Sequence, residues 1–148
     1  ARLAVAGYGL PEHWRDRWPD ERVEWLWFVP DLCALQRRCA GFVAALRHGG
    51  GSKLKVLEAM AAGLPLVSTA QGVSGLAVQP QAHYLAGESA EALADAIVRL
   101  LDQPLLARQL ADAAREYARQ YHDWAVAGDE LEHIYNTLID SKEFQPCA

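Results

Sequence analysis

Residues 47–69 read RHGGGSKLKVLEAMAAGLPLVST, and this stretch decides both the fold class and the function that we expect. Three glycines, Gly49 to Gly51, follow an apolar run and precede a helical pattern that stops at Gly63. A glycine loop lets backbone N–H groups approach an anion closely, and the N-terminus of a helix adds a positive dipole. The arrangement predicts a diphosphate site, with Glu58 about one turn further on to accept hydrogen bonds from sugar hydroxyls. The stretch therefore indicates a nucleotide-sugar site.

Apolar runs and helical patterns alternate on both sides of the loop. Strands are predicted at residues 3–6, 23–29, 41–46 and 66–68, with short strand segments at 77–78 and 83–86. Helices are predicted near residues 11–18, 31–38, 53–62, 90–101, 104–121 and 124–138, with a loop at 71–75. The expected N-caps include Asp31, Ser52 and Ser89. The alternation predicts an α/β fold, a Rossmann-like parallel sheet flanked by helices, with the glycine loop at the carboxyl end of a strand, where such sheets bind ligands.

Composition excludes several classes of protein. The 148 residues are 51% hydrophobic, which suits one domain with its own core, and no apolar run reaches the roughly 18 residues of a membrane span. Residues 1–62 hold nine basic and seven acidic side chains, whereas residues 63–148 hold five and twelve. Without a basic stripe, no nucleic-acid partner is expected. Cys33, Cys39 and Cys147 form an odd set without Cys-x-x-Cys spacing, which argues against a disulfide framework or a zinc site.

Two other phosphate motifs fit the sequence poorly. A P-loop needs Gly-x-x-x-x-Gly-Lys-Ser/Thr, but here the order is Gly51-Ser52-Lys53 and residue 46 is leucine. A dinucleotide fingerprint that starts at Gly7 would place Glu12 at its third glycine position, where a carboxylate repels a pyrophosphate. We therefore set both motifs aside.

The charged residues around the loop each have a second interpretation. At about 100° per residue, Glu58 lies roughly 40° from Leu54, at the border of an expected apolar arc of Leu54, Leu57 and Ala61. Glu58 could instead be a surface side chain paired with Lys55, three residues earlier. Spacing alone does not decide between the two. Arg47, Lys53 and Lys55 are either phosphate contacts or solvated surface charges, and Arg47 offers a two-pronged fork to a phosphate.

From Leu3 onward the chain resembles the nucleotide-sugar-binding half of the group 1 glycosyltransferases of the GT-B fold, which transfer a sugar from an activated donor with retention of configuration. The specific motif is EAMAAGLPLV at residues 58–67, supported by residues 4–7, 28–32, 46–51, 72–76 and 121–124. The resemblance implies that Glu58 holds the donor ribose, that the backbone around Lys53 and Leu54 receives the diphosphate, and that the segment around Val29 and Pro30 lies near the base. The predicted donor-binding residues are Val29, Pro30, Arg47, Gly49, Gly50, Gly51, Ser52, Lys53, Leu54 and Glu58.

The chain departs from the family pattern at several points. Many members carry an acidic residue eight positions before the Glu, touching the transferred sugar, and Gly50 stands there instead. Trp27 replaces a usual glycine. The chain also begins late relative to the family, so we expect residues 1–148 to be one donor-binding domain truncated at its N-terminal edge, without the acceptor domain.

The function expected from the resemblance is that of a retaining glycosyltransferase acting on a glycan, lipid or related acceptor, with this chain as the donor-binding part and inactive alone. The loop amides, the helix dipole and nearby cations would stabilise the departing diphosphate, and no metal or cofactor is required. The expected location is the cytoplasm, with peripheral attachment to the inner face of the membrane as one option. The expected partners are the donor, the missing acceptor domain and a second copy of the chain. The alternatives are a GT-B-fold nucleotide-sugar epimerase and a non-catalytic nucleotide-sugar-binding or assembly module, with which Gly50 is compatible.

Overall fold

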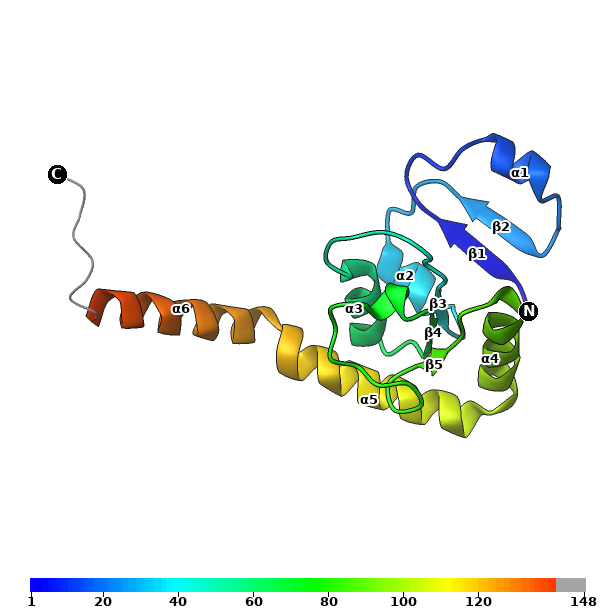
Figure 1. The fold of residues 1–148 in the computed structure, drawn as a ribbon. Helices are drawn as coiled ribbons and strands as arrows, with labels where there is room; N and C mark the ends of the chain where they lie inside the picture. Colours follow the sequence, from blue (N-terminus) through cyan, green and yellow to red (C-terminus); the bar gives the residue numbers. More distant parts are fainter. Residues whose placement is uncertain (141–148) are drawn as a thin grey trace. The chain divides into compact units, whose positions relative to one another are not determined.

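The chain divides into two compact units in the computed structural model, and each is described by itself (Figure 1). The N-terminal unit covers Ala1–Arg38 and the C-terminal unit covers Cys39–Ala148. The structure describes residues 1–140, so Cys147 lies outside the described residues. Over the described part, no helix combines the length and the apolar character that crossing a bilayer would take.

The N-terminal unit is a two-stranded parallel sheet with two short helices. Strand β1 (Leu3–Ala6) pairs with β2 (Val23–Leu26), and α1 (His13–Arg17) connects them. Strand β2 is shorter than the predicted 23–29 because β1 ends at Ala6 and a turn follows at Tyr8 and Gly9, which leaves no strand for the residues after Leu26 to pair with. Helix α2 (Leu32–Gln36) follows, and the Asp31 N-cap is confirmed, since its Oδ1 accepts from the Ala34 N–H at 2.8 Å.

The C-terminal unit holds a second parallel sheet, in the order β3-β4-β5. Its strands are β3 (Phe42–Ala44), β4 (Leu66–Ser68) and β5 (Leu85–Ala86). Its helices are α3 (Leu54–Ala61), the 3₁₀ turn η1 (Gln71–Val73), α4 (Ala90–Asp102), α5 (Pro104–His122) and α6 (Trp124–Asp140). The predicted α/β class and the parallel strands are confirmed, and the hydrogen bonds divide the strands into two sheets, one in each unit.

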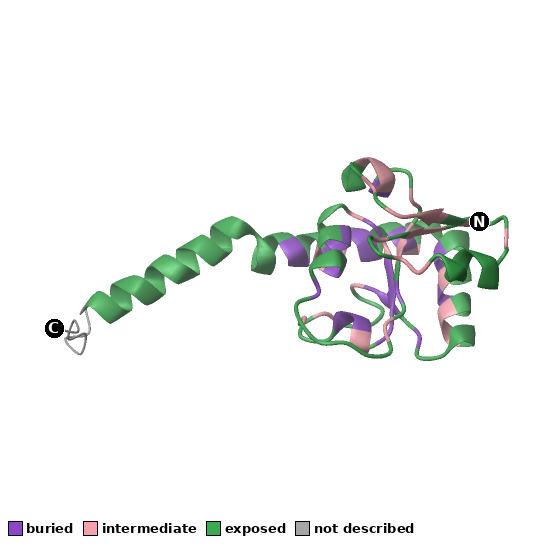
Figure 2. Cartoon of the chain, turned by 90° about the horizontal axis from the view of Figure 1, so that it is seen from above, coloured by how far each residue is buried: buried purple, intermediate pink, exposed green. Residues whose placement is uncertain are grey.

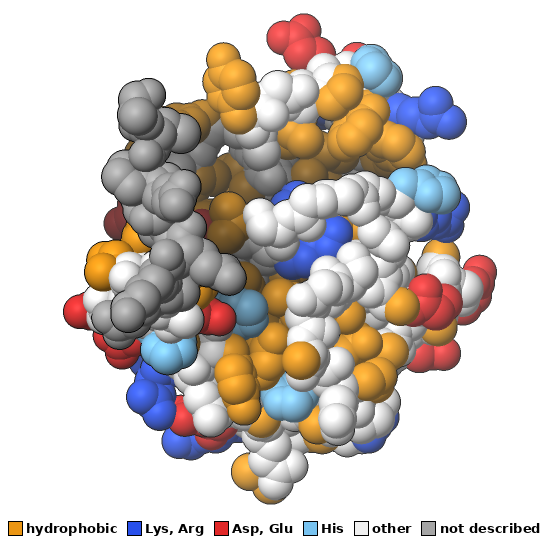
Figure 3. Space-filling model, turned by 60° about the vertical axis from the view of Figure 1, so that its left-hand side comes forward, with side chains coloured by type: hydrophobic (Ala, Val, Ile, Leu, Met, Phe, Trp, Pro, Cys, Tyr) orange, Lys and Arg blue, Asp and Glu red, His pale blue; other side chains and the backbone are white. Residues whose placement is uncertain are grey.

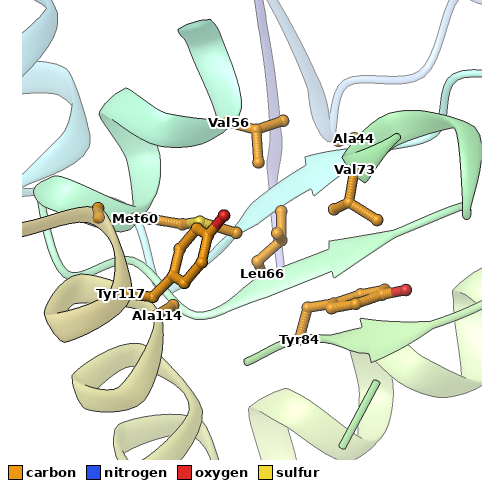
Figure 4. Packing of buried hydrophobic residues seen from close by; sticks show 9 residues of the cluster. Ala44, Val56, Met60, Leu66, Val73, Tyr84, Ala114 and Tyr117 are labelled. Atoms are coloured by element: carbon orange, nitrogen blue, oxygen red, sulfur yellow. The ribbon is translucent and has the colours of Figure 1, made fainter. Parts of the chain in front are cut away.

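Both faces of the second sheet are covered by helices. Leu66 and Val67 are neighbours on β4, so their side chains point to opposite faces, and both are buried. Leu66 packs in a cluster with α3 and α5, in which Met60 and Tyr117 point toward each other (Figure 4). Val67 packs in a second cluster with α4 and the start of α5. A strand buried on both faces is typical of the Rossmann-like arrangement that the sequence predicted.

Several predicted boundaries differ from the structure. Helix α3 begins at Leu54 with Lys53 as its N-cap, and Ser52 makes no cap hydrogen bond, so that prediction was wrong. The Ser89 cap of α4 is confirmed by its hydrogen bond from the Ala92 N–H at 3.1 Å. Residues 77–78 form no strand, because the Ala77 N–H donates to the Tyr117 hydroxyl at 2.9 Å instead of to a neighbouring strand. The predicted loop at 71–75 begins with η1.

Helix α6 carries an apolar stripe that stays exposed. Its residues 124–139 are all exposed (Figure 2). The stripe consists of Leu131, Ile134, Tyr135 and Leu138, each about half exposed, at the spacing predicted for one helix face. Asp123 interrupts the helix between α5 and α6. Its backbone is extended, and its carboxylate accepts a hydrogen bond from the Ala125 N–H at 2.9 Å.

Candidate functional site

The glycine loop, residues 45–53, leaves the carboxyl end of β3 and leads into α3. Gly49 and Gly51 have φ angles of +129° and +81°, conformations that side chains rarely adopt. A Cβ atom placed on Gly49, Gly50 or Gly51 would meet no atom within 4 Å. The loop is therefore uncovered and lies at the end of a parallel strand, the position predicted for it.

The backbone N–H groups of the loop are available to a ligand. Across residues 49–55, no backbone N–H donates to an acceptor anywhere in residues 1–140. The first turn of any helix leaves such donors without partners, and together they carry a partial positive charge. Here the glycines that precede α3 lengthen this run of free donors. The arrangement can bind an anion with several oxygen atoms.

Lys53 stands at the junction of the loop and α3 and is 94% buried, since its residue exposure is 6%. Its ammonium group makes no hydrogen bond or ion pair with any residue the structure describes. No fully enclosed side-chain nitrogen in those residues lacks a partner, so the ammonium group keeps access to solvent while its stem is buried. A buried stem fixes where the charge emerges. One face of the molecule shows Lys and Arg side chains recessed between ridges of backbone and polar atoms (Figure 3).

Glu58 lies on the exposed face of α3. The buried face is formed by Val56, Ala59 and Met60, whereas Leu54 is 62% exposed. The expected apolar arc through Leu54 was therefore wrong: Leu54 and Glu58 are one turn apart on the exposed face, and small Ala59 packs inside. The alternative pairing of Glu58 with Lys55 is not formed within residues 1–140. The Glu58 carboxylate is thus free to accept hydrogen bonds.

The remaining predicted residues differ in where they lie. Arg47 and Ser52 are exposed in the loop, as is His48. Val29 is partly buried and Pro30 exposed, and both belong to the N-terminal unit. Their role at the base of the donor stays a prediction. In the described part of the chain, no group of three His, Cys, Asp or Glu side chains is placed to hold a metal ion.

Two residues of the loop's surroundings were missed by sequence reasoning. The Thr69 hydroxyl donates to the Leu46 carbonyl at 2.5 Å, and the Gln71 amide donates to the Gly49 carbonyl. Both donors follow β4 and therefore lie at the same end of the sheet as the loop. A signal for them was present in the sequence. Both residues follow β4 closely, and β4 is the neighbour of β3, the strand that leads into the loop.

Gly72 allows this segment to pack tightly. A Cβ atom at this position would lie 2.2 Å from the Ser68 hydroxyl and 2.5 Å from the Ala44 carbonyl oxygen. The Gly72 N–H also donates to the Thr69 hydroxyl at 3.0 Å. Only glycine fits here, so the segment that holds the loop is itself fixed against β3 and β4.

Comparisons with known proteins identify the family. Residues 1–103 match the family model described as glycosyl transferases group 1. The chain is 33% identical over 147 residues to the phosphatidyl-myo-inositol mannosyltransferase of Mycobacterium leprae (strain TN), covering 95% of this chain and 39% of that protein. It is 34% identical over 100 residues to a D-inositol 3-phosphate glycosyltransferase of Corynebacterium aurimucosum, covering 66% and 24%. The chain thus spans well under half the length of these relatives.

Solved structures show the same fold. Sucrose-phosphate synthase from Thermosynechococcus elongatus superposes with a TM-score of 0.80 at 24% identity, covering 95% of this chain and 39% of that one. Anabaena HepE, solved in complex with UDP, gives a TM-score of 0.80 at 18% identity, covering 92% and 41%. At these identities the likeness extends to the fold alone.

Proposed function

Because this chain belongs to the group 1 glycosyltransferases, we propose that it is the donor-binding part of a longer, retaining enzyme whose glycine loop binds the diphosphate of a nucleotide sugar. The observation that carries the proposal is the run of N–H groups at residues 49–55, which lack partners within residues 1–140, together with Lys53, whose ammonium group has no partner there either. The mannosyltransferase relative and the HepE structures described as complexes with UDP and UDP-glucose support a nucleotide-sugar donor.

The chemistry of the proposed site is electrostatic. When the sugar leaves the donor, negative charge builds up on the nucleoside diphosphate. The loop amides, the N-terminus of α3 and the Lys53 ammonium group stabilise this charge. Glu58 accepts hydrogen bonds from the donor ribose. We propose a glycan, a lipid or a related molecule as the acceptor.

The exposed stripe on α6 is the surface that we assign to a protein partner. Leu131, Ile134, Tyr135 and Leu138 present contiguous apolar side chains, and such surfaces mark interaction sites. The acceptor-binding part of the enzyme is the partner that we propose, with a second copy of the chain taking its place when that part is missing. The proposed location is the cytoplasm, with attachment at the inner face of the membrane as one option.

The test of this function is nucleotide binding by the full-length protein. Calorimetric titrations with UDP, GDP and ADP should identify one base that binds. Lys53→Met keeps the buried stem and removes the charge, so it should weaken binding of that diphosphate by about 1.5–3 kcal/mol, the range for a hydrogen bond to a charged group. Arg108→Met, on an exposed part of α5, is the matched control.

Three outcomes separate the possible activities. Incubation of the full-length protein with nucleotide sugars yields transfer to an acceptor, a changed sugar configuration or binding alone. Transfer supports the proposal. Epimerisation or binding without turnover would replace it with one of the two alternatives, and equal affinity of wild type and Lys53→Met would remove Lys53 from the site.

A further inference from the structure

The part of the glycine loop before Lys53 makes few hydrogen bonds. Among residues 1–140, the segment 46–52 takes part in two hydrogen bonds, both received by its carbonyl groups from side chains of the segment after β4. No side chain packs against the Cβ positions of the three glycines. Glycine loses more conformational freedom on ordering than any other residue. These two bonds are therefore the hydrogen bonds that hold residues 46–52 in shape before a ligand arrives.

The Gln71 bond determines which way a loop amide points. In a trans peptide group the C=O and the following N–H point in opposite directions. When the Gln71 amide holds the Gly49 carbonyl, the N–H of Gly50 is turned away from Gln71. Without that bond, the peptide between two unhindered glycines can turn over and present its carbonyl oxygen, which repels a phosphate.

Gln71 is in turn held by its neighbours. The Ala70 N–H donates to the Glu88 carboxylate at 2.7 Å, which anchors the start of η1 to the segment after β5. The close approach at Gly72 fixes the other side of the turn. The side chain that orients the loop thus extends from a rigid turn, whereas nothing packs against the Cβ positions of the three glycines of the loop.

We propose that Gln71 is a positioning residue, which fixes the Gly49–Gly50 peptide with its N–H toward the diphosphate and its carbonyl away from it. Thr69 does the same for the Leu46–Arg47 peptide, one step nearer β3. This inference rests on the proposed function, because it places the diphosphate on the side of the loop to which the Gly50 N–H points when Gln71 holds the Gly49 carbonyl. Gln71 contacts the loop and not the donor.

The test compares Gln71→Glu and Gln71→Leu with wild type in the full-length protein. Glutamate keeps the length of the side chain but replaces the donor with an acceptor, which repels the Gly49 carbonyl. Gln109→Glu, an exposed residue of α5 without a hydrogen bond in the described part of the chain, is the matched control. The probes are UDP, GDP and ADP and the corresponding monophosphates, measured by calorimetry, with melting temperatures recorded for every variant.

Both Gln71 variants should bind the preferred diphosphate about tenfold more weakly, which corresponds to the loss of roughly one hydrogen bond to a charged group. In the proposed site the loop contacts the diphosphate. The affinity for the monophosphate, which is smaller in wild type, should therefore change less, and the preference for diphosphate over monophosphate should shrink. The melting temperature and the behaviour of Gln109→Glu should match wild type. Gln71→Asn, whose side chain is one methylene shorter, should not restore binding.

The outcomes separate this inference from the function beneath it. If wild type binds a nucleoside diphosphate and Gln71→Glu binds it equally well, the positioning role is overturned and the proposed function stands. An equal loss for diphosphate and monophosphate, or a lowered melting temperature that accounts for the loss, also overturns the positioning role. If wild type binds none of the three diphosphates, the proposed function fails and takes this inference with it.

Discussion

The two ends of α3 both contain glycines with positive φ, yet they are built in opposite ways. At the C-terminal end, the Gly63 N–H donates to the Met60 carbonyl at 2.9 Å and the Leu64 N–H donates to the Ala59 carbonyl at 3.0 Å. This pair of bonds satisfies carbonyl groups that the helix leaves over. At the N-terminal end, Lys53 makes no cap bond and the amides of the preceding loop have no partners in residues 1–140.

The difference in hydrogen bonding distinguishes Gly63, which ends the helix, from Gly49 and Gly51, which belong to the proposed binding site. A positive φ at Gly63 completes the hydrogen bonding of the helix, so that end is a structural element. At Gly49 and Gly51, positive φ values leave the N–H groups without partners in residues 1–140, and the result is a row of unpaired donors. Substitutions at the closed end should therefore lower stability, and substitutions at the open end should lower ligand affinity.

The largest expected effect concerns the N-terminal end of α3, which in the proposed function supplies the donor side of the reaction but not the acceptor side. Rate acceleration requires donor and acceptor to be aligned and water to be excluded. We expect the 148-residue chain to fold and to show no sugar transfer, whereas the full-length protein turns over. A donor-consumption assay of both proteins measures this. Comparable turnover by the 148-residue chain would mean that all of the chemistry lies in these residues.

Glu58 provides the next largest effect and belongs to the open side of α3. Glu58→Gln in the full-length protein should weaken donor binding by about 1–3 kcal/mol, because it removes a charged hydrogen-bond acceptor. Stability should not change, since no described residue pairs with Glu58. Calorimetry with the donor and a denaturant titration measure the two quantities, with Glu132→Gln on α6 as the control. Unchanged donor affinity would remove Glu58 from the site.

A matched pair of alanine substitutions compares the two ends directly. Gly63→Ala places a side chain at φ +76° in a fixed pair of hydrogen bonds and should lower the free energy of unfolding by about 1–2 kcal/mol. Gly51→Ala is strained as well, but its loop is unpacked and can relax, so stability should fall less and diphosphate affinity should fall more. Equal stability losses, with affinity unchanged in both variants, would refute the distinction between the ends.

The smallest effects concern two serines that the sequence predicts to be N-caps. Ser89 accepts a hydrogen bond from the first turn of α4, so Ser89→Ala should cost about 1 kcal/mol of stability. Ser52 makes no such bond at α3, and Ser52→Ala should leave stability within about 0.5 kcal/mol of wild type. Urea denaturation measures both. A loss for Ser52→Ala as large as that for Ser89→Ala would mean that the N-terminal end of α3 is capped after all.

Local signals in the sequence predicted much of this region. The family, the α/β class, the position of the glycine loop and the end of α3 at Gly63 are confirmed, because each depends on residues close together in the chain. The binding role of Glu58 and of the loop stays a prediction. The buried face of α3 was predicted wrongly because an apolar residue in the first turn, Leu54, was counted as core and Ala59 was not.

Contacts between distant residues could not be predicted from patterns. Gln71 and Gly49 are 22 positions apart, and nothing in the periodicity of either segment shows that they meet. The same holds for the Ala77 N–H, which is bonded to Tyr117, 40 positions away, where a strand was predicted. Such bonds depend on how the ends of β3 and β4 and the last turns of α5 pack, which only the folded structure shows.

The tryptophans are distributed unevenly, so that intrinsic fluorescence reports on one unit more than on the other. Four of its five tryptophans, at positions 14, 18, 25 and 27, lie in the N-terminal unit, and Trp124 is 91% exposed on α6. Trp14 makes edge-to-face contacts with Trp18 and Trp25, at ring-centre distances of 6.0 and 6.5 Å. Changes in emission wavelength on unfolding will therefore report chiefly on the N-terminal unit. Far-ultraviolet circular dichroism, dominated by α4, α5 and α6, will follow the C-terminal unit, so the two signals together reveal whether the units melt in one step or two.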